Sequence, residues 1–226
     1  MHFKTYLEID LHAKNGKLLK HHRQESRSWT KHFFDLLYEP LGNATNSQAS
    51  INDISGTGRA LPATGSYGDL PNLMLSAPGG GGGFVIPASC SNGSSGGFAC
   101  GTPFYTGDSF GVQIGTGNTA VAPTDDHLTA RIAHGESAGQ MDYGGCELAG
   151  YTASGSNVSF VIRRYFTNVA GGSIGVQETG IYAVGEQSNG SPGAAYPFCI
   201  CHDVVVTVTV TNGQILVVTY TLQTTV

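Results

Sequence analysis

The chain of 226 residues has few charged side chains and no long apolar segment. Charged residues make up 12% of the sequence, about half of the usual share in soluble proteins. It contains neither a sustained heptad pattern nor an apolar run of about 18 residues, the length that a membrane-spanning helix needs. Glycine is abundant instead, with 33 residues. This composition argues against a helical enzyme and against a helical membrane protein, and it favours an all-β protein rich in turns.

Two features typical of secreted proteins are also missing. Charged residues interrupt positions 1–10, which therefore do not form a secretory signal, and we expect synthesis in a cytosol. Five cysteines are too few for a disulfide scaffold of this size. Cys90 and Cys100 enclose a Gly- and Ser-rich loop that a disulfide can close. We expect that bond only if the protein matures outside a reducing cytosol.

The remaining cysteines raise the question of a zinc site. Cys199 and Cys201 are separated by one residue, so that both thiols are expected on the same face of a strand. Cys146 and His202 complete a set of four zinc-binding residue types, but their spacing fits no common zinc motif. Buried free thiols are the favoured interpretation.

The charges are divided unevenly along the chain. Seven of the 11 basic residues lie within the first 31 positions together with three acidic residues, so that this part has a net charge of +4. The rest of the chain carries −9. A basic N-terminal part on an acidic body fits docking between copies of the chain or onto an acidic partner. The alternative is a solvated hairpin whose edge is protected by lysine.

Residues 1–42 are predicted to form a docking arm that consists of a hairpin and a short helix. The alternating run 6–11, the dipeptide Asn15-Gly16 and the run 17–20 indicate two paired strands with a tight turn. Ser28 is the expected N-cap of a helix that Pro40 and Gly42 end. The predicted interface residues of this arm are Trp29, Phe33, Phe34, Leu37, Tyr38, Lys17, Lys20, Arg23 and Arg27.

Residues 43–108 form a Gly-, Ser- and Pro-rich segment with five consecutive glycines at 79–83. Short apolar pieces, such as 73–75 and 84–86, are too closely spaced for a disordered linker. We therefore predict a partly ordered, extended excursion that lies over another surface. Proteins of large assemblies contain such segments more readily than compact monomers, because a neighbouring subunit can cover them.

Residues 109–226 are predicted to form the β body. Its strongest local signal is Asn212-Gly213, which lies between two runs of β-branched residues and predicts a hairpin with a type I′ turn. The alternate valines from Val204 to Val210 are expected on one face of its first strand. With the earlier strands the body has at least six antiparallel strands. It is mainly β, and an antiparallel β-sandwich of the immunoglobulin-like or jelly-roll kind is the predicted fold.

Arg163 and Arg164 are adjacent within the predicted strand 158–166, so that their side chains point to opposite faces. One of them must face the core or an interface, and there it needs a carboxylate. Glu178, on the predicted return strand 173–182, is the expected partner. We expect a structural role for this pair rather than a catalytic one.

Asp125, Asp126 and His127 form the densest polar cluster of the sequence. Two carboxylates and an imidazole are a weak candidate for a site that binds a divalent ion, but adjacent carboxylates diverge on an extended chain. Aspartates that cap their own turn are the favoured interpretation. Neither a metal nor another cofactor is therefore expected.

One short motif resembles a catalytic signature. Gly135 to Gly139 matches the G-x-S-x-G pattern of the nucleophile elbow, with Ser137 at its centre. The alternation of strands and helices that surrounds this motif in hydrolases is missing, so that a flexible turn is favoured. A hydrolase that uses Ser137 with His127 or His134 is a second alternative, and the main prediction is a protein without enzymatic activity.

The predicted strands and turns also occur in a recognisable order. The series consists of the segments 111–125, 161–168, 174–182 and 210–222, and the N-terminal part from Leu7 to Leu37 adds to it. This ordered series resembles a widespread type of structural protein of tailed bacteriophages. The resemblance covers most of the chain except residues 43–108. It implies a virion component, without indicating a position on the capsid, neck, tail or fibre.

The predicted function is that of a homo-oligomeric virion protein that is assembled in the host cytoplasm. It would dock on the capsid or the head-tail neck through residues 1–42, with copies of itself and other virion proteins as partners. Neither nucleic acid nor a membrane is expected as a partner. The alternative is a receptor- or glycan-binding tail protein that recognises a host surface glycan through loops 115–127 and 185–197, where Tyr196 and Phe198 are the nearest aromatic platforms.

Overall fold

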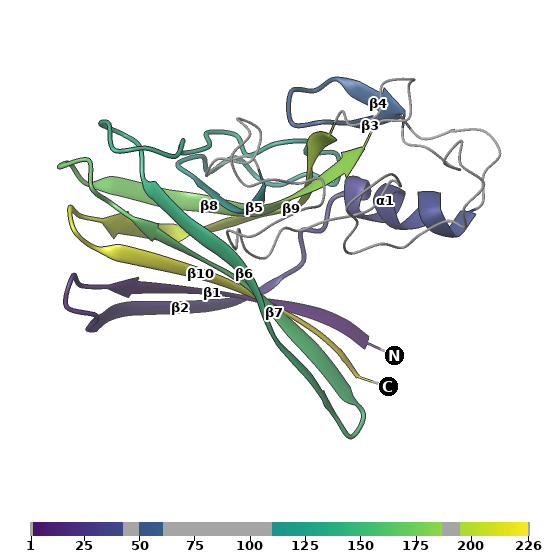
Figure 1. Cartoon of the computed structure of the whole chain (residues 1–226), viewed down its shortest axis with the longest axis horizontal. Coiled ribbons are helices and arrows are strands. Elements are labelled where there is room, and N and C mark those ends of the chain that lie inside the picture. The colour runs from purple at the N-terminus through teal and green to yellow at the C-terminus, as the bar shows by residue number, and fades with distance from the viewer. Residues whose placement is uncertain (1, 43–49, 61–109, 187–194, 226) are drawn as a thin grey trace, which may run out of the picture.

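The computed structural model describes residues 2–42, 50–60, 110–186 and 195–225 (Figure 1). Within these ranges the chain is mainly β, with a single helix. The elements are β1 (His2–His12), β2 (Leu18–Ser26), α1 (Lys31–Gly42), β3 (Ser50–Asn52), β4 (Gly58–Ala60), β5 (Gly111–Gly115), β6 (Asp142–Ser154), β7 (Asn157–Thr167), β8 (Ile174–Glu186), β9 (Ala195–Val210) and β10 (Ile215–Thr225). Most of the predicted excursion over 43–108 lies outside the described residues, as do Cys90 and Cys100; residues 50–60 form the small hairpin of β3 and β4.

Two antiparallel sheets form the body of the molecule. Sheet A has the strand order β2-β1-β10-β7-β6, and sheet B has the order β5-β8-β9. The sheets lie in two layers in Figure 1, and buried side chains from both contribute to one hydrophobic core. In β1, for example, Leu7, Ile9 and Leu11 are buried, while the residues between them are partly exposed. The predicted antiparallel, sandwich-like β fold is confirmed.

The predicted N-terminal hairpin is confirmed. β1 and β2 pair in antiparallel fashion, and Gly16 takes a φ of +82° in the turn and donates its N–H to Ala13 O. β1 also pairs with β10 along its whole length, from His2 opposite Thr225 to His12 opposite Ile215. Residues 2–26 therefore belong to the same sheet as the C-terminal strand and do not form an arm separate from it.

The predicted closing hairpin is wrong in its pairing. Asn212 and Gly213 do reverse the chain, since Gly213 takes a φ of +79° and Gln214 N donates to Thr211 O. The two strands on either side then enter different layers, because β9 pairs with β8 in sheet B and β10 lies between β1 and β7 in sheet A. The turn over 168–172 likewise leads from β7 in sheet A to β8 in sheet B. Both turns are connections between the sheets.

β9 is irregular, which changes the face that its valines present. Val208 and Val210 are buried, but Val206 is 62% exposed and Val205 is buried instead. The register between β8 and β9 shifts in this stretch, because β9 contains additional residues there. The prediction that all the alternate valines share one face is therefore wrong.

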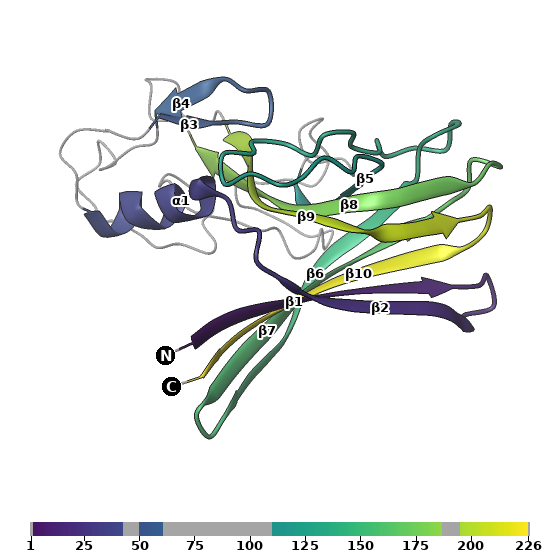
Figure 2. The same cartoon turned by 180° about the vertical axis from the view of Figure 1, so that it is seen from behind.

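α1 begins later than predicted. Ser28 does not cap it, because residues 28–30 continue past the end of β2 and bond to the edge of β9: His202 N donates to Ser28 O, and Thr30 N donates to Ile200 O. Figure 2 shows this segment crossing from β2 towards sheet B and α1. The helix passes through Pro40 and ends at Gly42. Among the described residues no helix is both long and apolar enough to cross a membrane.

Candidate functional site

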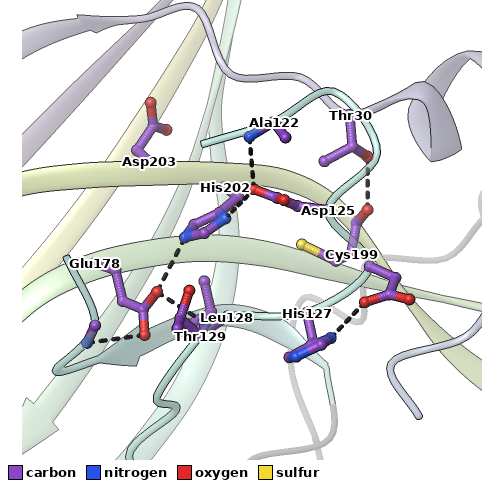
Figure 3. Close-up of polar contacts among 12 residues, drawn as sticks. Thr30, Ala122, Asp125, His127, Leu128, Thr129, Glu178, Cys199, His202 and Asp203 are labelled. Atoms are coloured by element: carbon purple, nitrogen blue, oxygen red, sulfur yellow. Dashed lines mark hydrogen bonds and ion pairs between the residues drawn. The ribbon is translucent and has the colours of Figure 1, made fainter. Parts of the chain in front are cut away.

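A buried histidine lies between two carboxylates in sheet B (Figure 3). His202 is on β9 and is 2% exposed. Its Nε2 lies 3.0 Å from Glu178 Oε2 on β8, and its Nδ1 lies 2.7 Å from Asp125 Oδ2 in the loop between β5 and β6. These three side chains join the loop to two strands of the sheet. They are called the His202 network below.

The geometry of the His202 network requires a protonated imidazole. A neutral imidazole offers one donor and one acceptor, whereas each ring nitrogen of His202 faces a carboxylate oxygen, which only accepts. Burial by itself would lower the pKa of His202, but the hydrogen bonds to Glu178 and Asp125 and the charges of these groups outweigh it and raise that pKa. Both the contacts and the direction of this pKa shift therefore favour the protonated form of His202.

Glu178 is the anionic centre of the network. Its side chain is fully buried and accepts hydrogen bonds from the backbone N–H groups of Gly117, Thr129 and Ala130, at 3.1, 3.0 and 2.7 Å. Burial opposes ionisation, but the hydrogen bond from His202 and these backbone donors lower the pKa of Glu178 overall. The carboxylate is therefore hydrogen-bonded to both ends of the segment 116–130.

Two glycines make room for this carboxylate. A Cβ on Gly117 would lie 2.6 Å from Glu178 Oε1, and one on Gly115 would lie 2.7 Å from Ala130 O and still closer to Glu178 Oε1. The backbone of Gly115-Thr-Gly117 therefore packs directly against the Glu178 carboxylate. Glycine is required here by space, because any side chain would displace the carboxylate.

Asp125, Asp126 and His127, the weak candidates for a metal site, point to different partners. Asp125 binds His202 and also accepts the N–H of Ala122 at 2.9 Å, which confirms that it caps its own turn. Asp126 pairs with the exposed ring of His127. In the part of the chain that the structure describes, no group of three or more His, Cys, Asp or Glu side chains is arranged to hold a metal ion.

A second buried polar group lies on the other side of β9. Asp203 accepts hydrogen bonds from Ser26 Oγ at 2.8 Å and from Tyr220 OH at 3.1 Å, and the thiol of Cys201 lies 3.3 Å from the same oxygen. Burial and the nearby carboxylate raise the pKa of Tyr220, which therefore stays neutral and donates. This group links β2, β9 and β10 within the core.

Cys146, Cys199 and Cys201 are buried free thiols, which confirms the favoured interpretation. Burial raises the pKa of each of them, so that none is a reactive thiolate. Cys199 and Cys201 do not share a face: Cys201 belongs to the main core, and Cys199 packs with Leu128 in a second cluster. The prediction of a shared face is wrong because the register of β8 and β9 shifts here as well.

The two adjacent arginines point to opposite faces, as predicted, but Glu178 partners neither. Arg163 pairs with Glu147 on β6, with its Nη2 2.7 Å from Glu147 Oε2. Arg164 is buried and donates to the backbone oxygens of Gly144, Phe110 and Val112, and its guanidinium lies over the Tyr143 ring. The prediction of Glu178 as partner fails because β7 and β8 lie in different sheets. Arg164 instead joins sheet A to the edge of β5.

Ser137 lies in an exposed turn between the isolated bridge residues His134 and Met141. Its N–H donates to Gln140 Oε1, and its carbonyl oxygen accepts the N–H of Gln140. His134 Nδ1 accepts the N–H of Tyr143. The sharp turn from a strand into a helix that a nucleophile elbow requires is not found around Ser137 in the described chain.

The aromatic residues expected at an interface lie at different depths. Trp29 is partly buried, its Nε1 donates to Thr5 Oγ1 at 3.0 Å, and its ring contacts Phe3 and Phe33. Phe33 contacts Phe34, which is 60% exposed, and Phe3 is 53% exposed. Phe3, Trp29, Phe33 and Phe34 are called the aromatic cluster below. Leu37 and Tyr38 lie in α1, and their side chains are outside the described residues.

The basic residues of the N-terminal part mostly contact their own chain. Lys20 Nζ donates to Thr207 O on β9 at 3.0 Å. Arg23 pairs with Glu8, and Arg27 pairs with Glu25. Lys17 is exposed in the turn region. The structure contains one chain, so the predicted interface contacts of these residues stay predictions.

Sequence reasoning considered His202 only as a member of a zinc set that it disfavoured, and it missed the contacts of His202 with Glu178 and Asp125. A usable signal was present, since His202-Asp203 stands within a run of apolar residues from Phe198 to Val210. Polar groups in a buried strand need partners, so this dipeptide predicts two buried polar contacts. The identity of the partners depends on the pairing of β8 with β9.

No protein-family model, curated protein or solved structure matches the chain.

Proposed function

We propose that the protein is a non-enzymatic structural component of a tailed-phage virion that assembles as a homo-oligomer. The proposal rests on the ordered series of segments that resembles phage structural proteins. These segments correspond to β5 and the following loop, β7, β8, and the turn from β9 to β10. They supply Asp125 and Glu178 of the His202 network. Two residues of the segments that carry the resemblance therefore hold the loop against sheet B.

The observation that carries the non-enzymatic part of the proposal is the burial of the reactive groups. His202, Glu178 and Asp203 are each at most 2% exposed, and each is bound to side chains or backbone of the protein itself. A catalytic group must reach substrate within hydrogen-bond distance. These residues instead hold strands and loops in place through their hydrogen bonds.

The aromatic cluster is the proposed docking surface towards the capsid or the head-tail neck. Phe34 and Phe3 present exposed rings on either side of the partly buried Trp29 and Phe33. Exposed aromatic side chains next to a packed anchor are typical of protein interfaces. The hairpin itself is the less suitable surface, because β1 is paired on both sides and the arginines of β2 and its continuation are engaged with acidic residues of the same part of the chain.

The aromatic residues of the glycan-binding alternative do not form a free platform. Phe198 is fully buried. The ring of Tyr196 is covered by the Arg59 guanidinium, 3.6 Å from its centroid, and Arg59 is held in place by Asp53. A sugar ring stacks on an aromatic face that is open to solvent, and Tyr196 has one face under Arg59 and packs against the core.

The proposal is tested by substituting one exposed ring of the aromatic cluster in a phage that encodes this chain. Phe34→Asp is expected to leave the fold intact, because the side chain is exposed, and to abolish incorporation into purified particles by immunoblot. Val206→Asp is the matched control on a distant exposed strand position and is expected to be incorporated normally. Normal incorporation of Phe34→Asp would exclude the aromatic cluster as the dock, and absence of the unmodified chain from purified particles would refute the virion role.

A further inference from the structure

We propose that His202 is a pH-sensitive latch for residues 116–130, which we call the latch loop: the protonated imidazole holds the loop against β8 and β9, and loss of the proton releases it. The inference concerns the folded chain by itself and does not depend on the virion role. It follows from the hydrogen bonds between this loop and sheet B and from the protonation state that these bonds require.

The latch loop is attached to sheet B by two kinds of contact. Leu128 is buried against Tyr182 and Cys199 and donates its N–H to Tyr182 OH at 2.8 Å, and Gln177 Nε2 donates to Thr116 O; these contacts do not involve His202.

The other contacts are made by the two carboxylates of the His202 network. The two ends of the loop are held by Glu178, which accepts the N–H groups of Gly117, Thr129 and Ala130. Its middle is held by Asp125, which contacts His202 Nδ1 at 2.7 Å. His202 binds both carboxylates at once, so that one imidazole ring connects the end contacts to the middle contact.

Loss of one proton from the imidazole of His202 removes one of its two hydrogen bonds to the carboxylates. The neutral ring keeps a single N–H, which can serve either Glu178 or Asp125. The other ring nitrogen then presents a lone pair to a carboxylate oxygen at 2.7 or 3.0 Å, and two carboxylates face each other across an uncharged ring. Glu178 is fully buried and is the costlier carboxylate to leave without a partner, so it is expected to keep the remaining N–H. Asp125, whose side chain is 24% exposed, then loses its bond to His202 and gains further hydration when the loop moves away from the sheet.

The other ionisable groups around His202 do not replace this proton. These groups come from four elements. The strands contribute Glu178 and Tyr182 on β8 and Cys199 on β9, and α1 contributes His32. The latch loop and the residue after it contribute Asp125, Asp126, His127 and Arg131. Burial keeps Tyr182 and Cys199 neutral by raising the pKa of both, and it lowers the pKa of His32. His127 is exposed and pairs with Asp126 outside the buried site. The charge that changes inside the network near neutral pH is that of His202.

The direction of the effect follows from proton linkage. The pKa of His202 is raised in the closed state above the usual value of about 6.5. The latch is therefore at full strength below pH 6.5 and weakens as the pH rises towards the closed-state pKa. Its opening constant should rise by up to about tenfold per pH unit in this interval and then level off.

Release of the latch loop would extend to α1. Lys31 N, at the first residue of the helix, donates to Pro123 O in the loop at 2.7 Å. The aromatic cluster includes two residues of the first turn of this helix, Phe33 and Phe34. A loop that leaves the sheet thus removes a support of the helix that presents the exposed rings.

Amide hydrogen exchange of the full chain from pH 5.5 to 9 tests the proposal, with protection factors corrected for the intrinsic effect of pH. The amides of Gly117, Thr129 and Ala130 should lose protection by up to about tenfold per pH unit above 6.5, and at each pH they should be less protected than the amides of β10, whose exchange requires unfolding of the sheet. Protection of the three loop amides that does not change with pH, or that equals the protection of β10 at every pH, would overturn the latch, and this comparison needs no variant.

Three variants sharpen the test. His202→Gln has no titrating proton, so that the three loop amides should show at pH 5.5 the low protection that the unmodified chain reaches at high pH. His202→Arg keeps a cation with several donors and should retain high protection without a pH dependence. His21→Gln removes an exposed histidine that pairs with Asp10 and should leave the profile unchanged. An unaltered pH profile in His202→Gln, or the same loss of protection in His21→Gln, would contradict the assignment.

Discussion

Glu178 and His202 lie diagonally across the antiparallel strands β8 and β9, with Glu178 Oε2 3.0 Å from His202 Nε2. The direct cross-strand partner of His202 is Gly180, and that of Glu178 is Val204. The pair is enclosed by the latch loop, which supplies three backbone donors and one carboxylate. A buried ion pair of this kind is costly to break, because removal of one partner leaves the other charge uncompensated.

The first prediction concerns this buried carboxylate. Glu178→Gln removes the charge opposite His202 and places an amide among three backbone donors, so that the free energy of unfolding should fall by about 3 kcal/mol. Glu147→Gln is the control, since Glu147 forms a partly exposed pair with Arg163 and should contribute less than about 1 kcal/mol. Urea unfolding at pH 7 measures both. Equal effects of the two substitutions would contradict the buried role of Glu178.

The second prediction concerns the dependence of stability on pH. The pKa of Glu178 is lowered in the folded chain, so its contribution is present above the usual value of about 4.5 and is lost as the pH falls through the folded value. The pKa of His202 is raised, so its contribution is present below about 6.5 and is lost as the pH rises through the folded value. The stability gained from this pair should therefore be greatest between these limits.

Differences between variants isolate this contribution from that of other groups. The difference in unfolding free energy between the unmodified chain and Glu178→Gln should shrink as the pH falls below 4.5. The corresponding difference for His202→Gln should shrink as the pH rises above 6.5. Denaturant unfolding at half-unit pH steps measures both, and a constant difference over the whole range would show that the pair does not titrate as described.

The third prediction concerns the glycines that pack against the Glu178 carboxylate. Gly115→Ala places a Cβ against Ala130 O and Glu178 Oε1, which should lower the free energy of unfolding by about 2 kcal/mol. Gly172→Ala meets no atom within 4 Å and should leave stability unchanged or raise it by up to about 1 kcal/mol. Thermal and urea unfolding compare the two. An unchanged free energy of unfolding in Gly115→Ala would show that the Glu178 site accommodates a Cβ at this position.

The fourth prediction separates the two adjacent arginines. Arg164→Met removes the donors of three backbone oxygens at the junction of the two sheets and should cost about 3 kcal/mol of unfolding free energy. Arg163→Met breaks only a partly exposed ion pair on the same strand and should cost less than about 1 kcal/mol. If the two substitutions had similar effects, Arg164 would not be the link between sheet A and β5.

Local sequence patterns were sufficient for the parts of the fold that local contacts decide. The alternation in β1 and the Asn15-Gly16 turn predict the N-terminal hairpin correctly, because both strands and the turn lie within one short segment. The class of fold follows from the number of such strands. Asn212-Gly213 shows the limit of this reasoning: the dipeptide reverses the chain, but it does not decide whether the two strands pair with each other.

The partners of the buried charges depend on pairing between distant segments. β10 is placed between β1 and β7, and its contact with β1 joins the two ends of the chain. Glu178 was assigned to an arginine because β7 and β8 were expected to pair, and the observed pairing of β8 with β9 gives it His202 instead. The additional residues of β9 are equally non-local, since they are defined by its pairing with β8, and residues 28–30 bond to β9 beside one of the two register shifts.

The most direct test of the virion role is an electron-microscopy reconstruction of purified particles of a phage that encodes this chain. We predict density for the two-sheet body in several symmetry-related copies on the capsid or at the head-tail neck, with the aromatic cluster turned towards a neighbouring protein. Particles that contain no such density, with the chain recovered only as a free monomer from the lysate, would contradict the proposed function.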